Sequence, residues 1–258
     1  MAGFFGLFDY SKEGPGVSKN EPQKHRFFLF FDVYFRKFWK ICILSMLYVV
    51  SCIPIVTIGA ATAGFTYVLR NYAREEHAFL WSDYIDTAKK NWKMATVVFL
   101  IDIVAFILGF VAFSFYTSPD VALPGMLKTI ALGLLLMVSI IYTFMHYYIY
   151  VLLVTFNVTF RQLYKNSFIF AIVGLWRNIL ITIILAILGL AIFLFFPLSI
   201  FVVFFVLAGT MGFIINFTVY PLIKKLMIDP ILAQEEKKDV EDDEAIFDDE
   251  RKIGNNDE

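Results

Sequence analysis

A carboxylate, an imidazole and three phenols stand inside long apolar stretches of this sequence, where polar side chains are rare. Asp102 lies in the run TVVFLIDIVAFIL, and His146 lies in the next apolar run, within YTFMHYYIY, together with Tyr142, Tyr147 and Tyr150. If the two runs are antiparallel helices, Asp102 lies about 12 Å and His146 about 15 Å from the same end, because a helix rises about 1.5 Å per residue. The spacing therefore predicts that Asp102 and His146 meet at a similar depth.

Two roles would suit this pair. A protonatable Asp102 and His146 pair would line a polar pocket, with tyrosines that stack on a sugar or a lipid headgroup. Alternatively, the pair forms an interhelical hydrogen bond or ion pair that fastens two helices. The structural role is the commoner of the two, since a single intramembrane acid rarely makes a transporter.

Patterns of known catalytic and metal centres are absent from the sequence. The three histidines, His25, His77 and His146, show no metal-binding spacing, and Cys42 and Cys52 are too far apart along one helix for a disulfide. No Walker-type phosphate loop, dinucleotide fingerprint or GxSxG nucleophile motif occurs. We therefore expect no enzyme activity, no catalytic residue, no cofactor, no metal and no nucleic-acid partner.

The composition places the elements that carry these residues in a membrane. The chain of 258 residues is 59% hydrophobic, with a mean hydropathy of +0.71, whereas soluble domains average roughly 45–50% apolar residues. The predicted fold is all-α: a polytopic transmembrane helical bundle of about six spans, arranged as three hairpins in the lipid bilayer. These spans are expected at residues 38–53, 56–69, 94–116, 126–156, 179–196 and 198–223.

Lysine and arginine are distributed unevenly between the predicted loops. If the chain starts inside and forms three hairpins, 21 of the 22 Lys and Arg residues lie on the inner side, and Lys128 lies near an outer turn. Cytoplasmic loops of membrane proteins carry such an excess of positive charge. We therefore expect a multi-pass protein of the cell membrane, with the N-terminus and the C-terminus in the cytoplasm.

The changes in composition define three regions. Residues 1–37 are expected to form a cytoplasmic or interfacial N-terminal segment, residues 38–228 the transmembrane helical domain, and residues 229–258 an acidic, disordered cytoplasmic tail. Within the domain, residues 78–92 and 160–168 carry apolar side chains at helical spacing among charged ones. They are predicted to be interfacial amphipathic helices.

The stretch IPIVTIGAATAGF combines a turn proline with small residues at helical spacing. Pro54 marks the predicted outer turn of the first hairpin, and Gly59, Ala60, Ala63 and Gly64 follow it. Small residues four apart allow close contact between helix backbones, so they predict a helix-packing surface. The alternative is an unwound segment that lines a pocket. Whether this second span crosses fully or is re-entrant stays open.

The first part of the chain resembles a known family. FFGLFDYSKEGPGVSKNEPQKHRFFLFFDVYFRKFWK, CIPIVTIGAATAGFTYVLRNYAREE and WSDYIDTAKKNWK are similar to the YesL-like family of bacterial integral membrane proteins of unknown function. The most specific part is the P-x-x-T-I-G-x-A-T-A-G core from Pro54 to Gly64, in which Ala60 stands where family members commonly carry proline. The family has no assigned catalytic or binding residues that this chain could inherit.

The resemblance implies a function through gene neighbourhood. YesL-like proteins are often encoded beside ATP-driven carbohydrate uptake systems and sensor-regulator pairs, so we expect an accessory or regulatory component associated with carbohydrate uptake. Its partner would be an ATP-driven sugar permease or a sensor kinase, and a homo-oligomer stays open. The alternative is a transporter subunit that moves a sugar-like or other small solute through a pocket around Asp102 and His146. The inner loops lack the E-A-A-x-x-x-G motif of permeases that couple to an ATPase.

Overall fold

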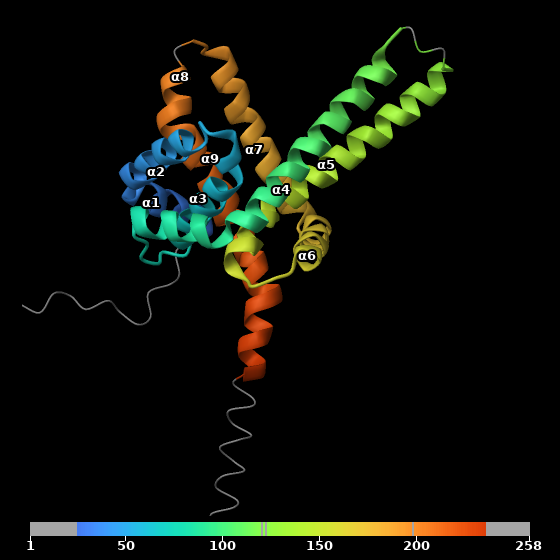
Figure 1. The fold of residues 1–258 in the computed structure, drawn as a ribbon. Coiled ribbons are helices and arrows are strands. Elements are labelled where there is room, and N and C mark those ends of the chain that lie inside the picture. The colour runs from blue at the N-terminus through green and yellow to red at the C-terminus, as the bar shows by residue number, and fades with distance from the viewer. Residues whose placement is uncertain (1–24, 120, 122, 198, 236–258) are drawn as a thin grey trace, which may run out of the picture.

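A computed structural model describes residues 25–119, 121, 123–197 and 199–235, and every regular element in them is helical (Figure 1). The α-helices are α1 (Arg26–Arg36), α2 (Phe38–Ser51), α3 (Ile58–Ala73), α4 (Leu80–Thr117), α5 (Gly125–Thr155), α6 (Phe160–Val173), α7 (Leu175–Leu194), α8 (Ser199–Val202) and α9 (Ala208–Ile223). A 3₁₀ turn, η1 (Ile55–Thr57), precedes α3. Two π-helical turns, η2 (Val203–Leu207) and η3 (Lys224–Ile228), flank α9.

Four helices in the described part of the chain are long and apolar enough to cross a membrane. They are α4, α5, α7 and the continuous helix Ser199–Glu235, which contains α8, η2, α9 and η3. The six predicted spans are thus not confirmed as six crossings, since α2 is a shorter apolar helix of 14 residues and α3 has 16. Sixteen helical residues extend about 24 Å, whereas the hydrocarbon core is about 30 Å thick.

The position of α3 beside α4 shows how the first hairpin differs from the others. Gly59, at the start of α3, lies so close to α4 that a Cβ atom there would be 2.3 Å from the carbonyl oxygen of Ala95. From Ala95, α4 continues for about 33 Å to Thr117. The α2–α3 turn therefore lies level with the start of the apolar part of α4, and in Figure 1 it lies lower than the α4–α5 and α7–α8 turns.

Helix α4 contains two elements that were expected to be separate. The predicted interfacial helix at residues 78–92 and the predicted span at 94–116 form one helix of 38 residues. No glycine or proline interrupts the sequence between Leu80 and Leu108, so neither of the residues that most often end a helix is present. By contrast, the second predicted interfacial helix is a separate element, α6, which begins at a capping box formed by Thr159 and Gln162.

The most buried helix, α3, holds the body together. Eleven of its sixteen residues are buried, and it packs against α2, α4, α5 and α9. Two apolar clusters flank it: one centres on α5, α6 and the end of α9, and the other joins α1, α2, α3 and the middle of α9. Beyond this body, α4 and α5 continue side by side as a projecting arm (Figure 1).

Pro221 within α9 connects that helix to α1. Proline has no backbone N–H, so the carbonyl oxygen of Phe217, four residues earlier, loses its usual helical partner. Arg26 Nη2 donates a hydrogen bond of 2.7 Å to this oxygen, and the guanidinium lies 5.2 Å from the centre of the Phe217 ring. Burial, and secondarily the charge of Arg177, lower the pKa of Arg26 from its ordinary value.

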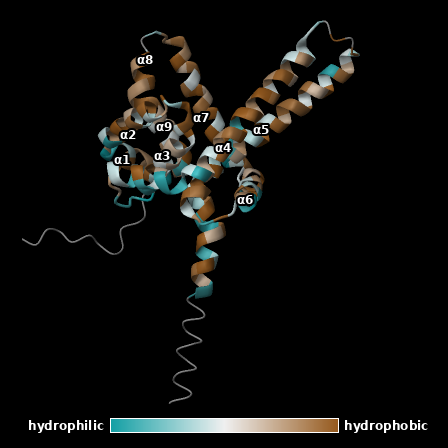
Figure 2. Ribbon diagram, in the orientation of Figure 1, coloured by the Kyte–Doolittle hydropathy of each residue, from teal (hydrophilic) through white to brown (hydrophobic). Residues whose placement is uncertain are grey.

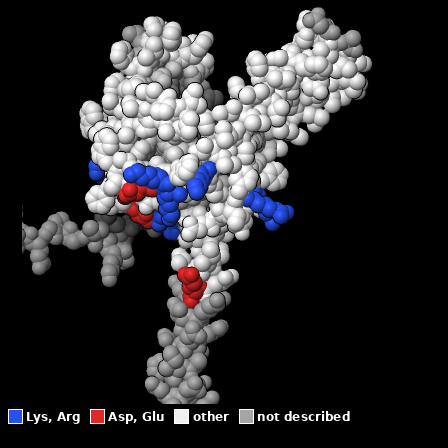
Figure 3. All heavy atoms as spheres, viewed as in Figure 1, with Lys and Arg blue, Asp and Glu red and all other residues white. Residues whose placement is uncertain are grey.

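Charged side chains gather at one end of the molecule. On the face shown in Figure 3, Lys, Arg, Asp and Glu lie at the lower end of the body and below it, and the arm and the upper parts of α7 and α8 show none. Figure 2 shows the same polarity along the ribbon, with hydrophilic residues on α1, the first part of α4 and α6. This distribution agrees with a membrane protein whose apolar helices extend away from a charged end. Residues 229–235 continue the last helix, and 236–258 lie outside the described residues.

Candidate functional site

Asp102 of α4 and two residues of α5 form a polar cluster at the base of the arm. Tyr142 Oη donates a hydrogen bond of 2.5 Å to Asp102 Oδ1, and His146 Nδ1 lies 3.6 Å from the same oxygen. Tyr142 and His146 are four residues apart, so they lie on one face of α5. The side chains of Asp102 and His146 are 21% and 42% exposed, so the cluster is open on one side.

The other two predicted tyrosines lie beside this cluster. Tyr150 is buried, and its ring packs edge-on against the His146 ring with centroids 5.5 Å apart. The hydroxyl of Tyr147 instead hydrogen-bonds Thr182 of α7 at 2.9 Å. The structure therefore brings Asp102, Tyr142, His146 and Tyr150 together. Tyr147 lines the same cleft, and its hydroxyl ties α5 to α7.

Three further residues join the site from helices that are distant in sequence. Tyr48 of α2 and Thr62 of α3 share a hydrogen bond of 3.1 Å between their hydroxyls and line the same cleft as Asp102. The hydroxyl of Tyr164, on α6, is buried within electrostatic reach of Asp102 and Tyr142. No local pattern marks these residues, because a tyrosine or threonine within a helix has many packing roles.

A cleft of about 1280 Å³ extends from the polar cluster between α4 and α5. Its polar end is lined by Asp102, Tyr142, His146 and the Tyr48 and Thr62 pair. Toward the α4–α5 turn its walls are apolar, with Leu108, Gly109, Phe110, Ala112 and Phe113 from α4 and Leu132, Leu135 and Leu136 from α5. The cleft is therefore polar at one end and hydrocarbon-like along most of its length.

The small residues of α3 lie against α4 and not against the cleft. Besides Gly59, Gly64 lies against α4, since a Cβ atom there would be 2.4 Å from the carbonyl oxygen of Tyr84. Ala63 is fully buried, Ala60 lines a smaller cavity of about 530 Å³, and Pro54 is exposed in the turn before η1. In the structure Gly59, Ala60, Ala63 and Gly64 are helical, so the segment is not unwound.

Arg70 has a structural role that sequence reasoning missed. It stands where a returning helix would meet the cytoplasm, yet it is only 6% exposed. Arg70 Nη1 donates hydrogen bonds of 2.9 Å to the Val154 carbonyl oxygen and to Thr155 Oγ1, at the end of α5. The last carbonyls of a helix lack partners within the helix, so Arg70 satisfies one of them and joins α3 to α5. Burial lowers its pKa from the ordinary value.

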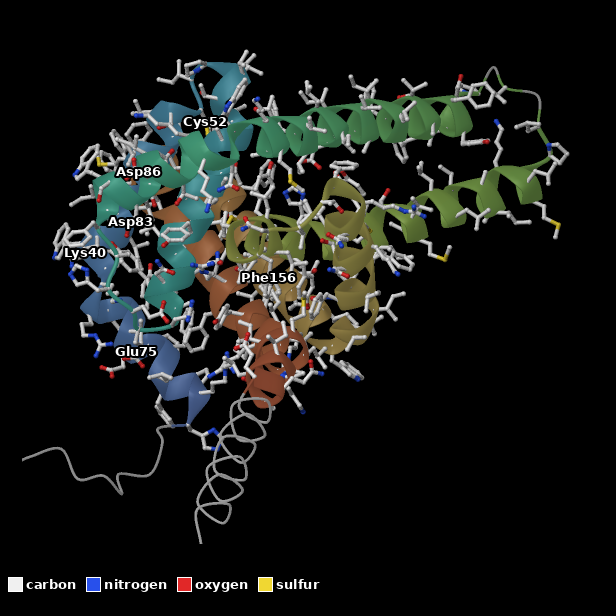
Figure 4. All side chains as sticks on the ribbon, turned by 60° about the horizontal axis from the view of Figure 1, so that its bottom comes forward. Lys40, Cys52, Glu75, Asp83, Asp86 and Phe156 are labelled. Carbon is white, nitrogen blue, oxygen red and sulfur yellow. The ribbon has the colours of Figure 1, made fainter. Side chains whose placement is uncertain are left out.

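The opposite side of the body carries charged residues around the α3–α4 loop. Figure 4 shows Glu75 in this loop, Asp83 and Asp86 on the first part of α4, and Lys40 on α2, all away from the arm. Arg36 of α1 pairs with Glu75 at 2.6 Å, and the Lys37 ammonium lies 4.6 Å from the centre of the Tyr72 ring. These contacts attach the end of α1 to the α3–α4 loop and to the end of α3.

The chemistry available to the cluster is hydrogen bonding. Within the described residues, no three His, Cys, Asp or Glu side chains are grouped closely enough to hold a metal ion. Asp102 offers carboxylate lone pairs to a donor, and the His146 ring nitrogens can donate or accept a hydrogen bond. Such a site suits a ligand with hydroxyl groups.

Comparison with known proteins gives one match. Residues 41–114 match a family described as "Protein of unknown function, DUF624". No curated protein and no solved structure matches the chain. The matched residues contain α3, most of α2 and α4, and Asp102, whereas Tyr142 and His146 follow them. The family is the YesL-like family, and the resemblance of this chain to it is confirmed over residues 41–114.

Proposed function

We propose that the protein is an accessory or regulatory component of the cell membrane that binds a ligand in the cleft between α4 and α5. Its termini face the cytoplasm, and its partner is an ATP-driven sugar permease or a sensor kinase of carbohydrate uptake. The partner follows from the gene neighbourhood of YesL-like proteins. The ligand site follows from the geometry of Asp102, Tyr142 and His146.

One observation carries this proposal: the polar cluster opens into a cleft. A pair that only fastened two helices would need the hydrogen bond of 2.5 Å between Tyr142 and Asp102 and no adjoining space. Here the cluster forms the end wall of a cleft of about 1280 Å³, and ligand sites are concave, mostly apolar and supplied with a few convergent polar groups. The geometry therefore favours binding as well as fastening.

The transporter subunit remains the second candidate, favoured by the proximity of the Asp102 carboxylate and the His146 imidazole, 3.6 Å apart between two long apolar helices. A sugar that crossed the membrane through this cleft would have to pass the apolar walls between Ser139 and the α4–α5 turn. Each hydroxyl that leaves water without a new hydrogen bond costs about 1–3 kcal/mol. The apolar walls thus support an accessory role more than conduction of a sugar.

Purification from mild detergent, with mass spectrometry of the associated proteins, tests the proposal. The expected result is recovery of a permease, its ATPase or a sensor kinase together with the wild-type chain. The Asp102→Asn variant should still co-purify with the partner but should no longer bind the ligand. Asp86 is an exposed acid on the same helix, so Asp86→Asn serves as the matched control. Recovery of the chain alone, as a homo-oligomer that moves a sugar into liposomes, would support the transporter instead.

A further inference from the structure

We infer that the ligand of the α4–α5 cleft is a glycolipid: an amphiphile whose polyhydroxylated head binds at Asp102 and whose hydrocarbon chain lies between α4 and α5. This inference rests on the proposed ligand-binding role of the cleft and names the class of ligand.

The polarity of the cleft changes along its length. Hydroxyl, carboxylate and imidazole groups of Asp102, Tyr142, His146 and Thr62 line one end. Most of the other lining residues are apolar, although the hydroxyl-bearing Ser139 and Thr143 of α5 also line the cleft. The lining on α4 continues from Asp102 to Phe113, a distance of about 16 Å along the helix. A free sugar would contact only the polar end, whereas an amphiphile would match both parts.

The size and position of the cleft also suit a lipid. Pockets for drug-sized molecules measure roughly 300–1,000 Å³, and this cleft, of about 1280 Å³, is larger. Its walls belong to the apolar parts of α4 and α5. In each of these helices, only 6% of the most apolar stretch of 18 residues is buried within the molecule. The cleft therefore lies where these helices contact hydrocarbon, and a lipid can enter sideways from the bilayer.

The direction of the cleft agrees with a lipid of the leaflet on the charged side. Ala95 of α4 is level with the α2–α3 turn. Asp102 lies about 10 Å farther along α4. The apolar walls lie farther from the charged end, toward the α4–α5 turn. A lipid of this leaflet would thus place its head at the polar end and its chain in the apolar part, in its ordinary orientation.

The charge of the cluster favours a sugar head over an ammonium head. The Asp102 carboxylate already has an imidazole at 3.6 Å and a phenol hydroxyl at 2.5 Å, so it offers hydrogen-bond acceptors more than an unbalanced negative charge. Sugar hydroxyls donate to such oxygens. Tyr48, Tyr142 and Tyr150 also line the cleft, and aromatic side chains are suited to contact with the C–H groups of a sugar ring.

Native mass spectrometry of the full-length protein tests the inference with three probes: a diglucosyl diacylglycerol, phosphatidylethanolamine with the same acyl chains, and free maltose. We expect the wild type to bind the glycolipid at least about tenfold more tightly than either other probe, which corresponds to one or two added hydrogen bonds. Asp102→Asn and Tyr142→Phe should each weaken glycolipid binding about tenfold, and Asp86→Asn should not.

A second pair of variants examines the apolar part of the cleft. Gly109 lines the cleft, and a Cβ atom added there would have no other atom within 4 Å; Gly133 of α5 has equal space but does not line the cleft. Gly109→Leu should abolish glycolipid binding by filling the space for the chain, and Gly133→Leu should leave it intact. Because neither substitution meets a neighbouring atom at its Cβ, both variants are expected to fold.

Three results would overturn the inference. Equal binding of maltose and glycolipid would mean that the site takes a soluble sugar, and tighter binding of phosphatidylethanolamine would mean that it takes an ammonium head. Unchanged glycolipid binding in both Asp102→Asn and Gly109→Leu would place the lipid outside the cleft. Each of these results leaves the co-purification of a protein partner untouched, so failure of the inference is distinguishable from failure of the proposed function.

Discussion

At the scale of single residues, two tyrosines of α5 differ in the partner to which the hydroxyl bonds. Tyr142 and Tyr147 each form one hydrogen bond to a neighbouring helix through the hydroxyl. Tyr142 bonds the Asp102 carboxylate at 2.5 Å, and Tyr147 bonds the neutral Thr182 hydroxyl at 2.9 Å. Hydrogen bonds to charged groups contribute more than those between neutral groups.

We predict that Tyr142→Phe lowers the free energy of unfolding by about 1.5–3 kcal/mol and that Tyr147→Phe lowers it by about 0.5–1.5 kcal/mol. Both variants remove one hydroxyl from the same helix, so each serves as the control for the other. Unfolding by denaturant in detergent micelles measures the difference. An equal or larger loss in Tyr147→Phe would show that the contact with Asp102 is no stronger than the contact with Thr182.

The contribution of Arg26 to stability should depend on Pro221. Arg26→Ala should lower the free energy of unfolding by about 1–3 kcal/mol, because it leaves the Phe217 carbonyl oxygen without its donor. In the Pro221→Ala background the new backbone N–H can bond that oxygen, so the same change should cost less. A double-mutant cycle measures this coupling.

The control for this cycle lies on the same helix as Arg26. Arg36 forms an exposed ion pair with Glu75, and exposed ion pairs contribute only about 0–1 kcal/mol. Arg36→Ala should therefore cost little in either background. A loss from Arg26→Ala that is the same with and without Pro221 would refute the role assigned to the proline.

At the scale of elements, the contact between α3 and α4 decides the arrangement of the first hairpin. Because Gly59 and Gly64 lack a Cβ atom, the α4 backbone lies closer to α3 than any other residue at these two positions would allow. The consequence is that the α2–α3 turn stops level with Ala95, and α4 continues beyond it into the arm. Helices that approach this closely are typical of small-residue interfaces in membranes.

Gly59→Ala and Gly64→Ala should each destabilise the protein by about 1–3 kcal/mol, because the added methyl group would overlap a backbone oxygen that cannot move independently of its helix. Gly133→Ala and Gly189→Ala, where no atom lies within 4 Å, should be neutral or stabilising by up to about 1 kcal/mol, since alanine favours the helix. The thermal unfolding midpoint of each purified variant measures the effect. Four similar midpoints would contradict the close α3–α4 contact.

At the scale of the whole molecule, the separation of charged and apolar surfaces sets the orientation in the membrane. The charged end contains α1, the first part of α4 and α6, and the α4–α5 turn lies at the opposite end of the arm (Figures 1 and 3). The excess of Lys and Arg at the charged end predicts that this end faces the cytoplasm.

Cysteine labelling in whole cells tests this orientation. In a background in which Cys42 and Cys52 are replaced by serine, Gly125→Cys should react with a membrane-impermeant reagent added outside, and Lys90→Cys should react only after the cells are opened. Both positions are exposed in the structure. Labelling of Lys90→Cys from outside would reverse the proposed topology.

Hydropathy, charge and spacing along the sequence determined the all-helical membrane class, the ends of α2, α5 and α7 to within a few residues, and the meeting of Asp102 with His146. These features depend on local periodicity and on the constant rise of a helix, which one sequence carries. The same patterns divided α4 into two elements, because a change from amphipathic to apolar residues resembles a boundary although the backbone continues through it.

Only the tertiary structure decided the level of α3 against α4, the burial of Arg70 at the end of α5, and the arrival of Tyr48 and Thr62 at the cleft. Each of these depends on the relative position of helices distant in sequence. That position is determined by close packing at residues such as Gly59 and Gly64 and by backbone oxygens, at Phe217 and Val154, that need donors from other helices. Pairwise contacts of this kind leave no periodic pattern in a single sequence, so packing in three dimensions is their physical cause.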